Sequence, residues 1–181
     1  IEYWELEEAK LRRMPPEKEL AGKVALITGA AGGIGSATAN KFLKEGCCVI
    51  LTDIDSKALK KTKENFQNKF GIDVVKSIVM DVTNENDVKK AVYESVNIFG
   101  GIDILVANAG FASAAPFDKT SSKLWDKNMA VLSKGCFLIS REVYSQMMRQ
   151  NMGGSIIFIS SKNSLSASKG ASAYSVAKSS L

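Results

Sequence analysis

Histidine is absent from the 181 residues of this chain, and proline and cysteine are scarce, at three residues each. Without histidine, the commonest metal ligand and the commonest general base in proteins are both missing. This absence excludes a histidine-ligated zinc site, a Ser-His-Asp triad and a Cys-His catalytic pair. We therefore expect no metal ion in the protein.

The three cysteines also exclude a class of sites. Cys47 and Cys48 are adjacent, Cys136 lies far away in the sequence, and no C-x-x-C motif occurs, so structural disulfides and thiolate metal clusters are not expected. The chain also lacks a Leu/Val-rich signal sequence and any apolar run approaching the roughly 18 residues that suggest a membrane span. We expect a cytoplasmic protein with no membrane partner.

The residues that are present have the composition of a globular domain, with 45% hydrophobic and 24% charged side chains. A chain of this length buries roughly 70% of its unfolded surface, which is enough for a core. The formal net charge is +5, but the lysines are scattered along segments of helical spacing. Solvated helix faces explain them better than a nucleic-acid site, and no nucleic-acid partner is expected.

Short apolar runs alternate with longer helical segments from Lys23 onward. The predicted strands are Val24–Thr28, Cys48–Thr52, Val74–Met80, Ile104–Ala107 and Ser155–Ser160. The predicted helices are Ile34–Lys44, Ser56–Phe70, Asn84–Phe99 and a long one from about Ser121 to Arg149. Such alternation is typical of βαβ units. It predicts an α/β fold with a doubly wound parallel sheet in three layers, helices lying on both faces.

Residues 1–21 are predicted to form a lead-in or interdomain linker before a domain of residues 22–181. The segment Glu2–Met14 is charged and weakly helical, and Pro15-Pro16 should end it. A surface helix or linker is the simpler interpretation. The alternative is an interaction surface built on Tyr3, Trp4 and Leu6.

A glycine-rich turn follows the first predicted strand and leads directly into a helix. It reads Thr28-Gly29-Ala30-Ala31-Gly32-Gly33-Ile34-Gly35. Glycines allow the sharp reversal and the close approach of a pyrophosphate, which the amides at the helix start then bind. A P-loop is excluded because no Gly-Lys-Ser/Thr follows. The predicted cofactor-binding residues here are Gly29, Gly32, Gly33, Ile34 and Gly35.

The second strand ends at Asp53, twenty-four residues beyond Gly29. A carboxylate there can accept both hydroxyl protons of an adenosine ribose and would repel a 2′-phosphate. No arginine or lysine stands in the turn or at Ile54 to attract that phosphate, so NAD is favoured over NADP. Asp53 could instead be a helix N-cap, but the neighbouring Asp55 and Ser56 could also fill that role.

Ser161, Tyr174 and Lys178 form a third pattern after the fifth strand. Tyr174 and Lys178 are four residues apart, which places them on one face of a helix. A fixed ammonium favours the phenolate and makes tyrosine usable for proton transfer. Ser161 precedes Tyr174 by thirteen residues.

In combination with Asp81-Val82 and Asn108-Ala109-Gly110, these motifs resemble the short-chain dehydrogenase/reductase family from about Gly22 to the chain end. The resemblance implies a Rossmann fold with Tyr174 as the acid/base and Lys178 binding the nicotinamide ribose as well as lowering the tyrosine pKa. It also implies that Asp81 and Val82 flank the adenine, that Asn108 lines the cofactor cleft and that Ser161 holds the substrate oxygen.

One position departs from the family pattern. Trp125-Asp126 and Gly135-x-Phe137 align Leu132 with an asparagine that supports a proton-relay water in the family. Asn128 lies one turn earlier, about 6 Å along a helix axis. It is a candidate replacement, the alternative being a polar spot on the helix.

A narrower resemblance rests on Glu2-Tyr3-Trp4, on Leu11–Leu20, on Trp125–Asn128 and on Ser161-Lys162-Asn163. These segments are similar to bifunctional proteins that fuse a rhamnulose-1-phosphate aldolase-like domain to a dehydrogenase. That similarity implies a preceding aldolase domain and lactaldehyde as substrate.

The function predicted from these patterns is an NAD-dependent oxidoreductase acting on a small hydroxy-aldehyde or sugar-derived alcohol. The alternative is a dinucleotide-binding module that has lost catalysis. The family also implies a homo-oligomer formed through the helices beginning near Ser121 and Tyr174. The chain stops three residues after Lys178, so we expect a longer protein whose missing part carries the substrate lid, and an isolated segment that binds NAD weakly without turnover.

Overall fold

The structure is a computed structural model that describes residues 2–13 and 18–181. The lead-in segment contains helix α1 (Tyr3–Arg13), in which Lys10 pairs with Glu7 at 2.6 Å and Arg12 with Glu8 at 2.7 Å. Pro15-Pro16, predicted to end this helix, lies outside the described residues, as does Met14. The role of the segment as a linker stays a prediction.

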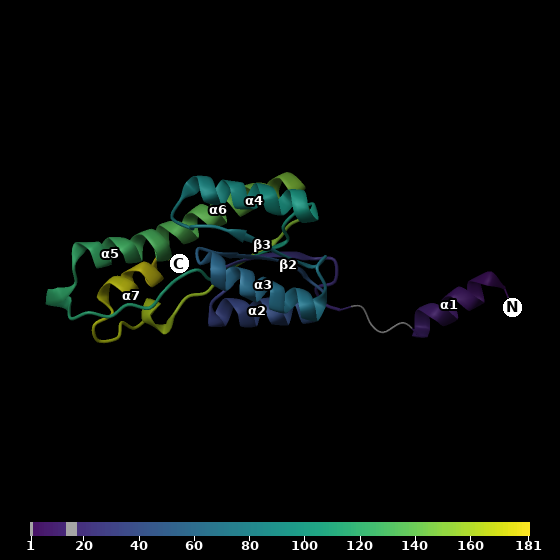
Figure 1. Ribbon diagram of the computed structural model, residues 1–181, viewed down its shortest axis with the longest axis horizontal. Coiled ribbons are helices and arrows are strands. Elements are labelled where there is room, and N and C mark those ends of the chain that lie inside the picture. The colour runs from purple at the N-terminus through teal and green to yellow at the C-terminus, as the bar shows by residue number, and fades with distance from the viewer. Residues whose placement is uncertain (1, 14–17) are drawn as a thin grey trace.

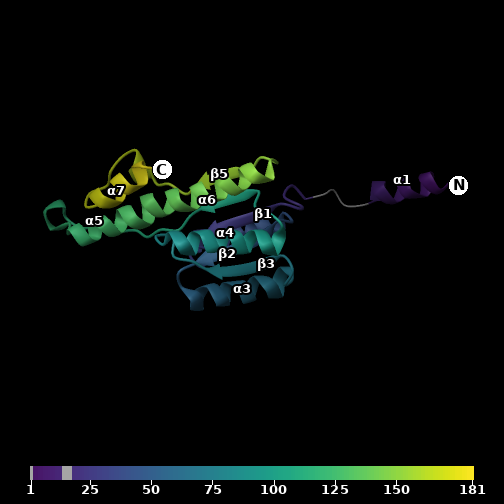
Figure 2. The same ribbon diagram turned by 90° about the horizontal axis from the view of Figure 1, so that it is seen from above.

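Five parallel strands form the sheet, in the order β3-β2-β1-β4-β5 (Figure 2). They are β1 (Val24–Thr28), β2 (Cys48–Asp53), β3 (Val75–Val79), β4 (Ile104–Ala107) and β5 (Ser155–Phe158). All five predicted strands are present, with β3 and β5 shorter than expected and β2 one residue longer. The order reverses beside β1, which confirms the predicted doubly wound parallel sheet.

Helices cover both faces of the sheet in three layers (Figure 1). Helices α2 (Gly33–Lys44) and α3 (Ser56–Phe70) lie on one face, and α4 (Glu85–Phe99) and α6 (Gly135–Gln150) lie on the other. Side chains of β1 alternate between two apolar clusters, because successive residues of a strand point to opposite faces. Ala25 and Ile27 pack beneath α2 and α3, whereas Val24 and Leu26 pack beneath α4 and α6.

The long helix predicted from Ser121 to Arg149 is interrupted. It consists of α5 (Ser122–Asn128), a π-helical segment η2 (Met129–Lys134) and α6. A π-helical turn holds one residue more than an α-helical one and rotates the helix beyond it. Gly135 then lies so close to the segment after β3 that a Cβ atom there would approach Val82 Cγ2 to 2.8 Å. Apolar periodicity alone does not reveal such an insertion.

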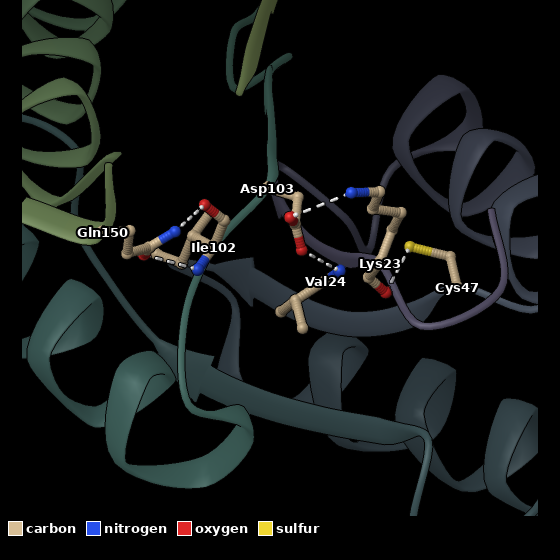
Figure 3. A network of polar contacts seen from close by, with 6 residues as sticks. All are labelled: Lys23, Val24, Cys47, Ile102, Asp103 and Gln150. Atoms are coloured by element: carbon tan, nitrogen blue, oxygen red, sulfur yellow. Dashed lines mark hydrogen bonds and ion pairs between the residues drawn. The ribbon is translucent and has the colours of Figure 1, made fainter. Parts of the chain in front are cut away.

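Side-chain hydrogen bonds fasten the amino ends of the central strands (Figure 3). The Val24 N–H donates to Asp103 Oδ2 at 2.9 Å. Gln150, at the end of α6, donates from Nε2 to the Ile102 carbonyl and accepts from the Ile102 N–H, both at 3.0 Å. The Cys47 thiol donates to the carbonyl of the residue before β1 at 3.1 Å. These contacts lie at the edge opposite the glycine-rich turn.

The remaining elements lie beyond the carboxyl ends of the strands. They are the 3₁₀ turns η1 (Phe117–Lys119) and η3 (Lys162–Ser164) and helix α7 (Ser172–Ser179). Helices α5 and α7 lie side by side in both views (Figures 1 and 2). Within residues 2–13 and 18–181, no helix has the length and apolar character needed to cross a membrane.

Candidate active site

A cavity of about 700 Å³ opens at the carboxyl ends of the strands. Ten of the predicted site residues line it: Gly29, Gly32, Gly33, Ile34, Asp53, Asp81, Val82, Asn108, Tyr174 and Lys178. Three predicted residues do not line it: Gly35, Ser161 and Asn128. The parallel direction of the strands explains why these residues lie together, because it brings all the carboxyl-end loops to one edge of the sheet.

The glycines of the turn serve two different purposes. Gly29 has φ +63°, and a Cβ atom there would lie 2.9 Å from Ala109 Cα. A Cβ atom at Gly35 would overlap the carbonyl of Gly29, so the chain's own packing requires both glycines. A Cβ atom at Gly33 would meet nothing within 4 Å. The open side of the turn at Gly33 therefore leaves room for a ligand.

Thr28 and Asn108 hold this turn to the end of β4. Thr28 Oγ1 accepts hydrogen bonds from the backbone N–H groups of Asn108 and Ala109, at 3.0 and 2.9 Å. Asn108 Nδ2 donates to the carbonyls of Thr28 and Gly29, at 2.9 and 3.1 Å. Asn108 thus lines the cavity and also fixes the turn. Thr28 was not among the predicted site residues, although it is the first residue of the motif that contains the glycine-rich turn.

Asp53 closes the other side of the turn. Its Oδ2 accepts from the Ala31 N–H at 3.1 Å and its Oδ1 from the Asp55 N–H at 3.0 Å. The N-cap of α3 is Asp55, whose Oδ1 accepts from the amides of Lys57 and Ala58. Asp53 is therefore not the helix cap that was weighed as its alternative role.

Asp81 and Val82 line the cavity after β3. Asp81 Oδ1 accepts from both the backbone N–H and the hydroxyl of Thr83, each at 2.8 Å. These bonds fix the carboxylate at the end of the strand. Thr83 was not singled out in the sequence, because nothing but its position two residues after an aspartate marks it.

Tyr174 and Lys178 lie one turn apart on α7, and both line the cavity. Lys178 is only 7% exposed, and its Nζ donates to the Ile159 carbonyl at 2.6 Å. Burial lowers the pKa of Lys178 below its ordinary value of 10.5. The ammonium is thus held by the loop after β5, one helical turn from the phenol-bearing residue.

Ser161 lies beside the cavity rather than on its wall, where its neighbour Ser160 is found. Ser161 Oγ caps η3 by accepting from the Asn163 N–H at 3.2 Å. A hydroxyl that accepts one hydrogen bond keeps its own proton free to donate. The side chain can therefore still donate to a ligand oxygen.

Asn128 and Leu132 occupy different surroundings on the interrupted helix. Asn128 is fully buried, and Leu132 is 1% exposed. Leu132 packs against Gly110 and lines a small second cavity together with Cys136 and Lys178. Its hydrocarbon side chain can neither donate nor accept a hydrogen bond in that cavity. The relay role of Asn128 stays a prediction.

Phe111, Lys127 and Val131 also line the cavity, although none of them was predicted as a site residue. Lys127 Nζ lies 4.8 Å from the centroid of the Phe111 ring. They come from the loop after β4 and from the helix around η2, which are brought together only by packing. Among the residues that the structure describes, no three histidine, cysteine, aspartate or glutamate side chains gather to hold a metal ion.

A parallel sheet that reverses its order beside a glycine-rich turn, with a cavity at the reversal, defines a Rossmann-like α/β protein. A family model described as short chain dehydrogenase matches residues 23–181, and the chain belongs to this family. The family to which the motifs pointed is thereby confirmed.

Solved structures and curated proteins of this family are similar to the chain over most of its length. NAD⁺-bound xylitol dehydrogenase is 34% identical with a TM-score of 0.86, covering 90% of this chain and 62% of that one. A short-chain dehydrogenase/reductase from Burkholderia phymatum in complex with NAD is 28% identical with a TM-score of 0.85. This match covers 90% of this chain and 57% of that one.

Among curated proteins, the uncharacterized oxidoreductase YuxG of Bacillus subtilis (strain 168) is 49% identical over 98% of this chain. The chain covers 26% of that relative. The 3-oxoacyl-[acyl-carrier-protein] reductase FabG of Aquifex aeolicus is 34% identical, with 91% of this chain and 66% of the relative covered. The chain thus spans about a quarter of YuxG and about two thirds of FabG.

Proposed function

We propose that the protein containing these residues is an NAD-dependent oxidoreductase. It transfers a hydride between nicotinamide and the carbinol or carbonyl carbon of a small hydroxy-aldehyde or sugar-derived alcohol. One observation carries the proposal: a single cavity joins the glycine-rich turn and Asp53 with Tyr174 and Lys178. Cofactor-binding groups and proton-transfer groups therefore face the same space.

The turn and Asp53 fit an NAD molecule. The N-cap of α2 is Gly32, which provides no side-chain cap, so the first amides of the helix are available to a pyrophosphate. The open side of Gly33 leaves space for that pyrophosphate. Each oxygen of Asp53 accepts one backbone bond and keeps capacity for a ribose hydroxyl. Its negative charge would repel the 2′-phosphate of NADP.

Tyr174 is the proposed acid/base. The nicotinamide cofactor, when bound, supplies or accepts the hydride. Tyr174 exchanges the proton of the substrate hydroxyl, and the Lys178 ammonium favours the phenolate that this exchange requires. Ser161 is proposed to hold the substrate oxygen with its free hydroxyl proton. With an aldehyde hydrate, loss of hydride from carbon and of the hydroxyl proton to Tyr174 would give a carboxylic acid.

The substrate class is supported by similarity to xylitol dehydrogenase, whose name identifies a sugar-derived alcohol. The finer proposal is lactaldehyde, produced by an aldolase-like domain in the same polypeptide. The similarity of the lead-in and Trp125–Asn128 segments to such fusions supports this proposal. The length of YuxG also supports it, because this chain covers only 26% of that relative. Three free thiols, at Cys47, Cys48 and Cys136, suit the reducing cytoplasm that the proposal assumes.

A homo-oligomer is also part of the proposal. The outer face of α5, η2 and α6 carries exposed apolar side chains, including Phe137 at 57% and Tyr144 at 56% exposure. Pairing of this face between two copies would cover them. Light scattering of the full-length protein tests this, and a monomer at micromolar concentration contradicts it.

The test of the function uses the full-length polypeptide. We expect NADH formation from NAD with lactaldehyde or with a member of a panel of small alcohols. Tyr174→Phe should lower the turnover number by about 10²- to 10⁴-fold, the usual contribution of a general acid/base, with the Kd for NAD within about twofold of wild type. Tight NAD binding without turnover of any substrate would instead support the catalytically lapsed binding module.

A further inference from the structure

The loop after β4 forms part of the cavity wall. Residues 110–113, which we call the cleft loop, begin directly after the Asn108-Ala109 pair that holds the glycine-rich turn. Gly110, Phe111 and Ala112 line the cavity. Ser113 comes next in the chain and bonds to α5 instead of lining the cavity.

A partly buried hydrogen bond joins the cleft loop to α5. Ser113 Oγ donates to Asn128 Oδ1 at 3.0 Å, and Asn128 Nδ2 donates to the Leu124 carbonyl at 2.8 Å. Asn128 is 0% exposed. A buried polar group that loses its partner is not compensated by water, so the amide favours keeping its partner and the loop its position.

A second contact joins the same two segments on the cavity side. Lys127, the residue before Asn128, places its Nζ 4.8 Å from the centroid of the Phe111 ring. Such a cation–π contact is attractive because the ring face carries partial negative charge. Both side chains line the cavity. The loop is therefore held from beneath by Asn128 and from the cavity by Lys127.

The interruption of the helix makes this arrangement possible. The π-helical segment η2 begins at Met129, immediately after Asn128. Its additional residue rotates the helix by about 100° relative to a continuous α-helix. Helix α6 can then bury Leu138 and Ile139 against the sheet, while Lys127 and Asn128 of α5 still face the cleft loop.

We propose that Ser113 and Asn128 are positioning residues that hold the cleft loop as the substrate-side wall of the site. They act through Phe111, which shares the cavity with Tyr174, and neither Ser113 nor Asn128 contacts the substrate. The inference rests on the proposed oxidoreductase function. It gives Asn128 a role in substrate placement in place of a role in proton relay.

The experiment compares Ser113→Ala and Ser113→Thr with wild type in the full-length polypeptide. We expect Ser113→Ala to raise the KM for the alcohol or aldehyde substrate by about tenfold, which corresponds to about 1.4 kcal/mol, with kcat and the Kd for NAD within twofold of wild type. Ser113→Thr, which keeps the hydroxyl, should restore the KM. The matched control is Ser145→Ala, which removes a serine hydroxyl that donates to the Arg141 carbonyl at 2.9 Å on α6.

A second measurement does not depend on turnover. Backbone hydrogen exchange in residues 110–113 should be at least fivefold faster in Ser113→Ala, with unchanged exchange in β1 and in Ser145→Ala. Unchanged exchange and KM in Ser113→Ala, or equal effects in Ser145→Ala, would overturn the proposal. Asn128→Ala gives a further test, since a loss confined to kcat would assign the residue to proton relay. If wild type turns over no substrate, the oxidoreductase function fails, whereas the exchange data still decide whether Ser113 holds the loop.

Discussion

Lys178 Nζ donates a hydrogen bond to the carbonyl of Ile159 at 2.6 Å. This bond connects α7 to the segment that continues from β5 into Ser160 and Ser161. Because the lysine is almost fully buried, its position is set by the backbone of a neighbouring element and not by solvent. The ammonium is therefore held in a fixed place on the helix that also carries Tyr174, and both residues line the cavity.

Lys178→Met should abolish turnover and change the pH dependence of stability. Burial lowers the folded-state pKa of Lys178, so the charged form costs stability below that pKa. As pH rises through the folded pKa toward 10.5, the unfolded state keeps its proton longer and this cost disappears. The free energy of unfolding of Lys178→Met, relative to wild type, should therefore fall as pH approaches 10.5. Urea denaturation across this range measures it, and a rising difference contradicts the prediction.

Asp53→Ala should change cofactor affinity. Two hydrogen bonds to the ribose would be lost, and we expect the Kd for NAD to rise at least tenfold, about 1.4 kcal/mol. The Kd for NADP should fall relative to that for NAD, because the repelling charge is gone. Titration calorimetry with both cofactors measures the ratio.

Asp55→Ala is the matched control for Asp53→Ala. It removes the N-cap of α3 and should cost about 1 kcal/mol of stability. Cofactor preference should stay unchanged, because Asp55 does not line the cavity. Equal changes of preference in the two variants would show that loss of local structure, and not loss of the Asp53 carboxylate, is responsible.

Gln150→Ala should lower stability without affecting the site. Its amide makes two hydrogen bonds to Ile102, which is 0% exposed. Losing both bonds should lower the free energy of unfolding by about 1–3 kcal/mol. The residue lies at the amino ends of the strands (Figure 3), so KM and kcat should match wild type. A normal urea midpoint would show that these bonds contribute nothing.

Cys47 should be unreactive in the folded protein. Burial raises the pKa of its thiol from 9.0 to about 12, and only the thiolate reacts. Iodoacetamide at pH 8 should label Cys47 only after unfolding, as mass spectrometry of the peptides would show. Because the folded pKa is raised, the thiol's contribution to stability is complete below pH 9 and is lost as pH rises toward 12. Cys47→Ala should therefore lose less stability over that range than wild type.

The fold was predictable because its signals are local. Buried strands such as Val24–Thr28 are continuous apolar runs, and the glycine-rich turn comes directly after one of them in sequence. The signal is also local for Tyr174 and Lys178, whose spacing of four residues indicates a shared helix face. Five strands, their parallel arrangement and ten of the residues that line the cavity are predictable from such patterns.

The rest depends on packing between distant segments. Ser113 and Asn128 are fifteen residues apart, no sequence pattern pairs them, and their bond exists only because α5 lies against the cleft loop. The π-helical segment cannot be predicted from the sequence either, since its residues have the composition of an ordinary helix. The cap that Ser161 provides for η3 is also not marked by a motif; its proposed role in holding the substrate oxygen stays a prediction.

The central place of β1 in the sheet has a consequence during synthesis on the ribosome. Its partner β2 is complete by Asp53, but its other partner, β4, begins only at Ile104. For the time needed to make about fifty residues, at roughly 5–20 residues per second, one edge of an almost entirely apolar strand has no neighbour. Unpaired apolar edges are sites of aggregation, so we expect the nascent chain to be most prone to aggregation before β4 emerges.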